Sequence, residues 1–292
     1  MRNVVSVTER LPVVVGVNDL PTAVHSVDLA AAEAAYRAVP LILVHAWSGW
    51  ARGTRYRVAV PDREHGRHLL ELAVTRARHA FPGIRVCGEL TDDSAATALL
   101  ARSADASLLV LGHQDTGGHR FGWGSTAAYL ARHSSCPVLV HQGQFRAQGP
   151  VTLAASGRMT ATLHLAFDHA ARAQCPLTVV HVSPPARPAT SDPRTAAETL
   201  LAETVVQAQH RWPHVTVQQV LIPDTDIGYT VQRACRRSRL LVAGTGRKGW
   251  TVEAFCSAYA DPGPQNRCPV LLVPPSWPSP APPVTAVSTA RC

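Results

Sequence analysis

Short apolar runs alternate along this chain with longer segments in which apolar residues recur every three or four positions. The runs are rich in β-branched residues and lack polar alternation, which is typical of strands buried on both faces of a parallel sheet. The segments between them have the period of helices that cover such a sheet. In the first half this pattern predicts strands at 12–17, 41–45, 84–90, 107–111 and 137–140, and helices at 22–38, 62–80, about 92–103 and 125–133.

The second half repeats this order of elements. Its predicted strands are 151–155, 177–182, 215–221, 240–243 and 270–273, and its predicted helices are 160–173, 194–211 and a third after Asp224 or Asp226. Alternating strands and helices imply right-handed crossovers and a doubly wound parallel sheet. The sequence therefore predicts an α/β fold made of two tandem, Rossmann-like sandwiches with about five strands each.

The repeat is also visible in the residues themselves. The segment SLLVLG, which ends at Gly112, returns as RLLVAG, which ends at Gly244, and Cys136-Pro-Val-Leu returns as Cys268-Pro-Val-Leu; both offsets are 132, because 244 − 112 = 268 − 136. A period this long indicates a duplicated domain, since solenoid repeats are about 20–50 residues long. We predict domains at 11–141 and 151–274, a linker at 142–150, and a disordered Pro-rich tail at 275–292.

Composition narrows the classes of partner. The chain carries 28 Lys and Arg against 20 Asp and Glu, a net charge of +8, but these basic residues are spread over both halves, which does not favour nucleic-acid binding. The seven cysteines form no Cys-x-x-Cys pair, which indicates a reducing compartment, and we expect a cytoplasmic protein. No apolar stretch approaches the about 20 residues needed to cross a bilayer, so we expect no membrane association.

A Gly-rich loop follows the strand at 107–111 and leads into the helix at 125. Ligands of doubly wound sheets bind beyond the carboxyl ends of the strands, and glycines let the backbone approach a phosphate there. The candidate residues are Leu111 and Gly112 before the loop, and Gly124, Ser125 and Thr126 at the start of the helix, where free amides favour an anion. The alternative, a surface loop that is merely rich in glycine, stays open.

Signatures of catalysis are missing from the sequence. There is no P-loop and no Gly-x-Ser-x-Gly elbow, and the pairs Asp92/Asp93 and Asp224/Asp226 are better explained as helix caps than as acid/base pairs. No nucleophile is accompanied by a base, and no cluster has metal-ligand spacing. We therefore predict that the chain is not an enzyme.

These features together resemble the universal stress protein family. The resemblance rests on Val13-Val-Val-Gly-Val-Asn18, on Leu43-Val-His-Ala46, and above all on Leu-Val-Leu-Gly112 … Gly124-Ser125 … Cys136-Pro-Val-Leu-Val140, and it covers about residues 11–275 as a tandem pair. Many members of that family bind ATP through a Gly-x2-Gly-x9-Gly-[Ser/Thr] loop, an Asp after the first strand and a backbone contact to adenine after the second. The resemblance thus implies that Gly112, Gly124, Ser125 and Thr126 hold the phosphates of an adenine nucleotide and that Ala46 contacts adenine.

Two departures from the family pattern affect this prediction. Asn18 stands in place of the Asp after the first strand, and Asp115 stands in place of the second loop glycine. The carboxylate of Asp115 would either repel phosphate or hold Mg²⁺ beside it. In the second half, Ser156 replaces Asn18, and Cys256, Ser257 and Ala258 replace Gly124, Ser125 and Thr126, so we predict a degenerate domain there.

The resemblance also implies a role and a mode of assembly. We expect a stress-response protein that acts through an unidentified protein partner, with ATP bound in the first domain only. Edge strands of the two domains should pair within the chain, residues 138–140 against 270–273, and a homodimer remains an alternative. The competing functions are a nucleotide-dependent hydrolase or transferase, which would have to use His113, Asp115 or His119, and a scaffold without a ligand. A solvated basic turn is the simpler interpretation of Arg247-Lys248.

Overall fold

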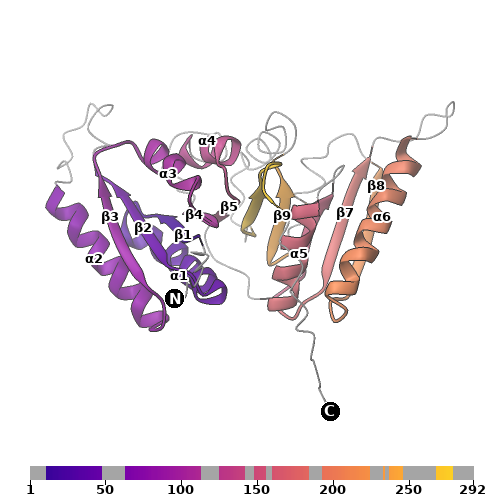
Figure 1. Ribbon diagram of the computed structural model, residues 1–292, viewed down its shortest axis with the longest axis horizontal. Coiled ribbons are helices and arrows are strands. Elements are labelled where there is room, and N and C mark those ends of the chain that lie inside the picture. The colour runs from indigo at the N-terminus through magenta and orange to yellow at the C-terminus, as the bar shows by residue number, and fades with distance from the viewer. Residues whose placement is uncertain are drawn as a thin grey trace, which may run out of the picture.

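The computed structural model of the chain describes residues 11–47, 63–112, 125–141, 148–155, 160–183, 193–223, 233, 237–245 and 268–278. Within these residues ten strands form one continuous sheet in the order β3-β2-β1-β4-β5-β10-β9-β6-β7-β8 (Figure 1). The fold is therefore α/β with a mostly parallel sheet, as predicted. The described helices do not include one long and apolar enough to span a membrane.

The first half contains the elements that the hydrophobic pattern predicts, with bounds that differ by a few residues. They are β1 (Val13–Gly16), α1 (Leu20–Arg37), β2 (Leu41–Ala46), α2 (Arg63–Ala80), β3 (Val86–Thr91), α3 (Ala95–Ser103), β4 (Leu108–Gly112), α4 (Ser125–His133) and β5 (Val138–His141).

The second half repeats these elements as far as the structure describes it. They are β6 (Val151–Ala155), α5 (Thr160–Arg172), β7 (Leu177–Ser183), α6 (Pro193–Arg211), β8 (Val217–Pro223), β9 (Leu240–Gly244) and β10 (Val270–Val273). The helix predicted after Asp224 or Asp226 lies outside the described residues, as do residues 279–292 of the predicted disordered tail.

The repeat extends to small details of the backbone. Helix α1 is followed by Ala38 and helix α5 by Gln174, with φ of 52° and 49°, and both are at the left-handed position that ends a helix. In both cases the next amide reaches back five residues: Val39 N donates to Ala34 O at 3.1 Å, and Cys175 N donates to Ala170 O at 3.1 Å. The offset is 136 in each case, because 174 − 38 = 175 − 39, so the two halves are copies of one unit.

Strands β5 and β10 join the two halves. They pair antiparallel, with Val140 opposite Val270, Leu139 opposite Leu271 and Val138 opposite Leu272. Every residue of both strands is buried. This pairing confirms the predicted seam between residues 138–140 and 270–273, and it turns two five-stranded sheets into one.

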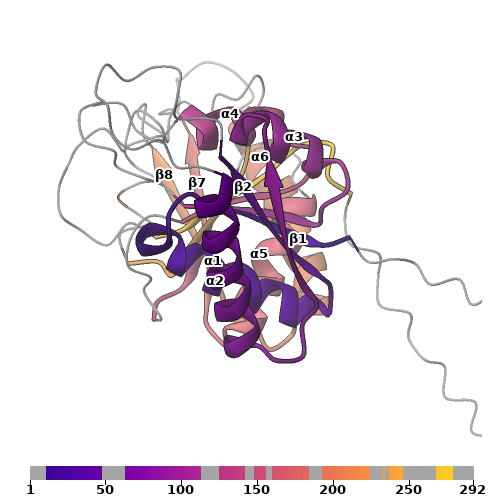
Figure 2. The same cartoon turned by 90° about the vertical axis from the view of Figure 1, so that its left-hand side faces the viewer.

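Among the described residues, helices of both halves cover one face of this sheet, and helices of the first half cover the other. Residues of α1, α2, α5 and α6 share one apolar core, and residues of α3 and α4 share a second core on the other face. Figure 2 shows α3 and α4 together at the top, with α1 and α2 below them. Because Leu139 contributes to the first core and Val138 and Val140 to the second, both faces of the seam are packed.

One helix cap differs from the prediction. Ser94, and not Asp92 or Asp93, caps α3: its side chain accepts from Thr97 N at 3.2 Å. Asp92 is instead used at long range, because its carboxylate accepts from the indole Nε1 of Trp47. The prediction chose the right residue type for a cap, but a competing tertiary contact holds Asp92.

Candidate functional site

The strand order reverses between β1 and β4. Strand β1 pairs with β2 on one side and with β4 on the other, so the chain first winds outward to β3 and then returns to the opposite side. This is the position where doubly wound sheets bind ligands, beyond the carboxyl ends of the strands. Asn18 follows β1, and Leu111 and Gly112 end β4, so these predicted residues flank the reversal point.

A buried histidine connects the ends of β1 and β2. The Nδ1 atom of His45 lies 2.8 Å from Val17 O, and since a carbonyl can only accept, Nδ1 donates. The side chain is 6% exposed and packs against Gly66 of α2, where a Cβ would stand 2.9 Å from its ring. His45 thereby fixes Asn18 relative to Ala46. The sequence analysis missed this role, although His181 repeats it with Nδ1 at 3.2 Å from Ala155 O.

The end of β2 is tied to β3. Ala46 is half-buried and pairs in register with Thr91, and Trp47 N donates to Thr91 O at 3.3 Å. The indole of Trp47 donates in turn to Asp92. The backbone at Ala46, the predicted adenine contact, therefore has a defined position at the carboxyl edge of the sheet.

Gly112 is packed closely against α1. A Cβ at this position would stand 2.9 Å from Ser26 Oγ, and Ser26 is completely buried. Its hydroxyl has no hydrogen-bond partner. Packing against Ser26 thus favours a glycine at the end of β4, independently of any ligand.

Helix α4 begins at Ser125, next along the chain after the Gly-rich loop. Its first turn contains no acidic residue, and Thr126 in that turn is half-buried. The positive end of the helix dipole and its free amides are therefore not neutralised by a carboxylate of the helix itself. Asp115 and Gly124, the other predicted loop residues, lie outside the described residues.

Two histidines lie beside Gly112 on the α1 side of the sheet. His141 ends β5 in register with Gly112, and its ring centroid is 5.6 Å from that of His25. Burial, with a smaller contribution from His25, lowers the pKa of His141 to about 4. At neutral pH, His141 is thus an uncharged polar group at the junction of the two halves.

The second half lacks this polar group of side chains. At the repeat offsets of 136 and 132, Ala161 and Val273 occupy the positions of His25 and His141. A Cβ on Gly244, the counterpart of Gly112, would meet nothing closer than 3.8 Å. Ser156 and residues 256–258, on which the prediction of a degenerate loop rests, lie outside the described residues.

The described part of this edge offers binding groups and no evident catalytic pair. No group of three or more His, Cys, Asp or Glu side chains that could hold a metal ion occurs among the described residues. Cys136 precedes β5 and therefore lies at the opposite, amino end of the strand; burial raises the pKa of its thiol to about 11, so it is not a thiolate at neutral pH. Backbone amides, hydroxyls and neutral imidazoles can hold an anionic or polar ligand by hydrogen bonds.

Comparison with known proteins agrees with this fold. The model of the universal stress protein family matches residues 10–142. Universal stress protein Rv2623 of Mycobacterium tuberculosis is 30% identical over 289 residues, which cover 90% of this chain and 96% of the relative. A universal stress protein of Mycolicibacterium smegmatis is 29% identical over 287 residues, 90% of this chain and 97% of that one. The chain therefore belongs to the universal stress protein family.

Solved structures share the fold at lower identity. A universal stress protein from Archaeoglobus fulgidus superposes with a TM-score of 0.64 at 14% identity, covering 89% of this chain and 96% of that chain. The cytoplasmic domain of a prokaryotic cation chloride cotransporter superposes with a TM-score of 0.57 at 8% identity, covering 92% and 98%. At these identities the likeness concerns the fold alone.

The contact between Gly112 and Ser26 predicts the effect of adding a methyl group. Gly112→Ala should lower the free energy of unfolding by about 1–3 kcal/mol, because the new Cβ overpacks against a buried hydroxyl. In Ser26→Ala/Gly112→Ala the loss should largely disappear, since the Ser26 Cβ is 4.0 Å from the new atom. Urea denaturation measures both values. Gly244→Ala is the matched control and should change stability by less than about 0.5 kcal/mol; an equal loss in both glycine variants would contradict the assignment.

The lowered pKa of His141 predicts a pH dependence. The unfolded imidazole takes up a proton near pH 6.5 and the folded one only near pH 4, so stability falls as the pH drops from 6.5 to 4. Replacing His141 by Val, the residue at the second-half position, should reduce the loss of unfolding free energy between pH 7 and pH 4.5 by about 1–2 kcal/mol after allowance for solvent screening. Urea denaturation at both pH values tests this, and equal losses in the two proteins would show that His141 is not protected from protonation.

Proposed function

We propose that the first half of the chain binds an adenine nucleotide, with ATP as the expected ligand, and that the chain regulates a protein partner without turning the nucleotide over. The observation that carries the proposal is that Asn18 follows β1 and Gly112 ends β4, the two strands that pair at the reversal point of the sheet. Residues that the sequence predicts for one ligand thus come from the strands that flank one site.

The physical chemistry of the edge supports an anionic ligand with a flat apolar group. The amides of the first turn of α4, which contains no acidic residue, favour phosphate. Ala46 is half-buried and carries no charge, which suits the backbone contact to adenine that the family resemblance implies. His45 keeps the two parts of the site at a set separation, because it joins the ends of β1 and β2.

A regulatory role without turnover is proposed because the described edge lacks the groups for chemistry. Phosphoryl or acyl transfer needs a positioned base, a nucleophile or a metal, and neither the described thiols nor the described histidines form such a set. The free thiols of Cys87, Cys136, Cys175 and Cys268 fit a reducing compartment, and we propose the cytoplasm. Whether Mg²⁺ accompanies the nucleotide depends on Asp115, so ATP binding is to be measured both with and without Mg²⁺.

Charge at the start of α4 provides a direct test. Thr126→Glu should weaken ATP binding at least about tenfold, because a carboxylate in the first turn repels phosphate at close range. The same carboxylate interacts favourably with the helix dipole, so the fold should not be destabilised. Isothermal calorimetry with ATP, in buffers with Mg²⁺ and with EDTA, gives the affinity, and native mass spectrometry of freshly purified protein shows any nucleotide that remains bound.

Two variants control for side-chain size and for position. Thr126→Gln has nearly the size of Glu without the charge and should bind ATP much more tightly than Thr126→Glu. Ala258→Glu places the same charge at the counterpart of Thr126, because 258 − 126 = 132, and should leave binding unchanged. Loss of binding in Ala258→Glu alone would assign the site to the second half. Absence of ATP binding in the unmodified chain would favour the scaffold, and release of ADP or AMP on incubation would favour the enzyme.

A further inference from the structure

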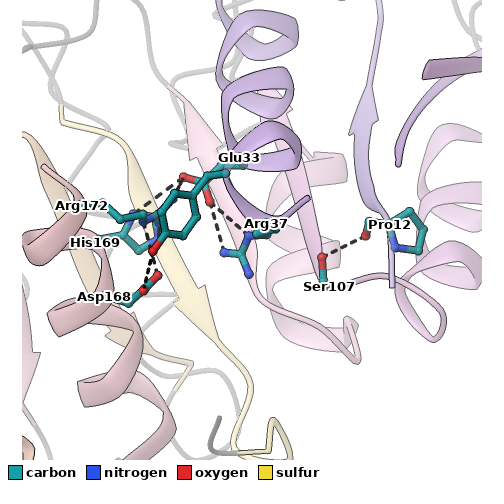
Figure 3. A network of polar contacts seen from close by, with 8 residues as sticks. Pro12, Glu33, Arg37, Ser107, Asp168, His169 and Arg172 are labelled. Atoms are coloured by element: carbon teal, nitrogen blue, oxygen red, sulfur yellow. Dashed lines mark hydrogen bonds and ion pairs between the residues drawn. The ribbon is translucent and has the colours of Figure 1, made fainter. Parts of the chain in front are cut away.

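A buried ionic cluster connects α1 of the first half to α5 of the second (Figure 3). Glu33 is 6% exposed, and its carboxylate accepts from Arg172 Nη1 at 3.0 Å and from Nε and Nη2 of Arg37 at 3.2 Å. Arg172 also donates to His169 Nδ1 at 2.6 Å and lies 4.1 Å from the ring centroid of Tyr36. The cluster joins the two halves near the C-terminal end of α1, whereas the carboxyl edge of β1 is at the start of that helix.

The charge state of the cluster is set by the arginines. Burial alone would raise the pKa of Glu33, but His169 and the two guanidinium groups lower it to about 2. Burial also lowers the pKa of His169 to about 3, so its imidazole is neutral at pH 7. Arg37 and Arg172 thus supply the positive charge that keeps Glu33 ionised, and Asp168 balances the second arginine from 3.3 Å.

The residues that meet across the two helices are each other's counterparts in the repeat. Glu33 faces His169, and Tyr36 faces Arg172; both pairs have the offset 136, because 169 − 33 = 172 − 36. At the seam, Leu139 pairs with Leu271. These two residues are also counterparts, because the repeat offset in this part of the chain is 132. Contacts between equivalent positions are the mark of a two-fold axis, so a pseudo-two-fold axis relates the halves and passes through this cluster.

A two-fold contact between identical domains would oppose identical residues. Two first halves would bring Glu33 against a second Glu33, and two second halves would bring Arg172 against a second Arg172. Each Glu33 would keep its own Arg37, and each Arg172 its own Asp168. The hydrogen bond from Arg172 to Glu33 across the two helices would be lost, however, and like charges would face each other in a buried contact, which is unfavourable. The duplicated chain avoids this conflict because the two copies carry different residues at the axis, namely Glu and Tyr on α1 and His and Arg on α5.

We propose that this cluster is a selectivity element: it makes the α1 face accept a stress-protein domain that carries His and Arg at the positions of His169 and Arg172, and it rejects a second copy of the first half. The partner of this face is therefore the second half of the chain, and pairing of like halves between two chains is disfavoured. The proposal is independent of nucleotide binding, because it concerns only the contact between α1 and α5.

Exchange of the facing residues tests the proposal in the full chain. Glu33→His/Tyr36→Arg gives α1 the residues of α5, and His169→Glu/Arg172→Tyr gives α5 the residues of α1. Each conversion should lower the urea midpoint, with the greater loss in Glu33→His/Tyr36→Arg, which removes the central carboxylate. The chain with all four changes restores complementary residues in reversed order, and it should recover about half or more of the lost midpoint, since the changes are strongly coupled.

Sedimentation velocity over a range of concentrations supplies the second measurement. Each converted chain carries like residues on both faces, so alone it should form no more dimer than the unmodified chain. An equimolar mixture of the two converted chains offers complementary faces on different chains and should form a concentration-dependent dimer, and the fourfold exchange should show the unmodified distribution. A matched control removes the exposed ion pair between Arg76 and Asp28, 2.6 Å long and confined to the first half; Arg76→Gln should leave the sedimentation unchanged.

Each outcome supports or contradicts the proposal that the cluster around Glu33 selects the partner domain. Recovery in the fourfold exchange supports complementarity, and this holds also if the converted chains fail to fold while the exchanged chain folds. A fourfold exchange whose loss equals the sum of the two conversions would show that the residues act only through local packing, and would overturn the proposal. Converted chains with an unchanged midpoint, whose mixture forms no dimer, would overturn it as well.

Discussion

The antiparallel pairing of β5 with β10 is the interaction on which the other features of this molecule depend. A five-stranded parallel half ends at β5 with unpaired amides and carbonyls, and such an edge invites association. In this chain the second half supplies the missing neighbour, with Leu139 opposite Leu271. The pairing fixes where α1 meets α5, and His141, which ends β5, is buried at the junction of the two halves.

Duplication allowed the two halves to diverge in two separate places. At the carboxyl edge, the first half has His25 and His141 beside Gly112, whereas the second half has Ala161 and Val273. At the pseudo-two-fold axis, Glu33 faces His169 instead of another Glu33. The first divergence lies at the edge where we propose that the nucleotide binds, and the second lies at the contact between α1 and α5.

Much of the fold could be predicted because local patterns of apolar and polar residues determine its strands and helices. Apolar runs marked the strands, the helical period marked the helices, and repeated segments such as Cys136-Pro and Cys268-Pro located the seam. The prediction of Asp92 or Asp93 as a cap was wrong, since Ser94 caps α3 and Asp92 accepts from Trp47, 45 residues away. Local sequence carries no information about such a competing contact.

The candidate site divides in the same way. Leu111 and Gly112 were predicted from the Gly-rich loop after their strand, and Asn18 and Ala46 from the family resemblance. The topology brings these strand ends to one edge of the sheet. The supporting contacts could not be predicted, because His45 reaches Val17 across 28 residues and Arg172 reaches Glu33 across 139. The pair of Glu33 and Arg37 at i and i+4 was visible in the sequence, but it did not reveal that the carboxylate would be buried against another helix.

Hydrogen–deuterium exchange with and without ATP tests the central claim most directly, because it reports on both halves of the intact chain in one experiment. The account predicts slower exchange of amides at the start of α4, residues 125–128, and after β1 at residues 17–19, with no change at residues 237–245 of the second half. Slower exchange confined to residues 237–245, or no change anywhere at saturating ATP, would contradict it.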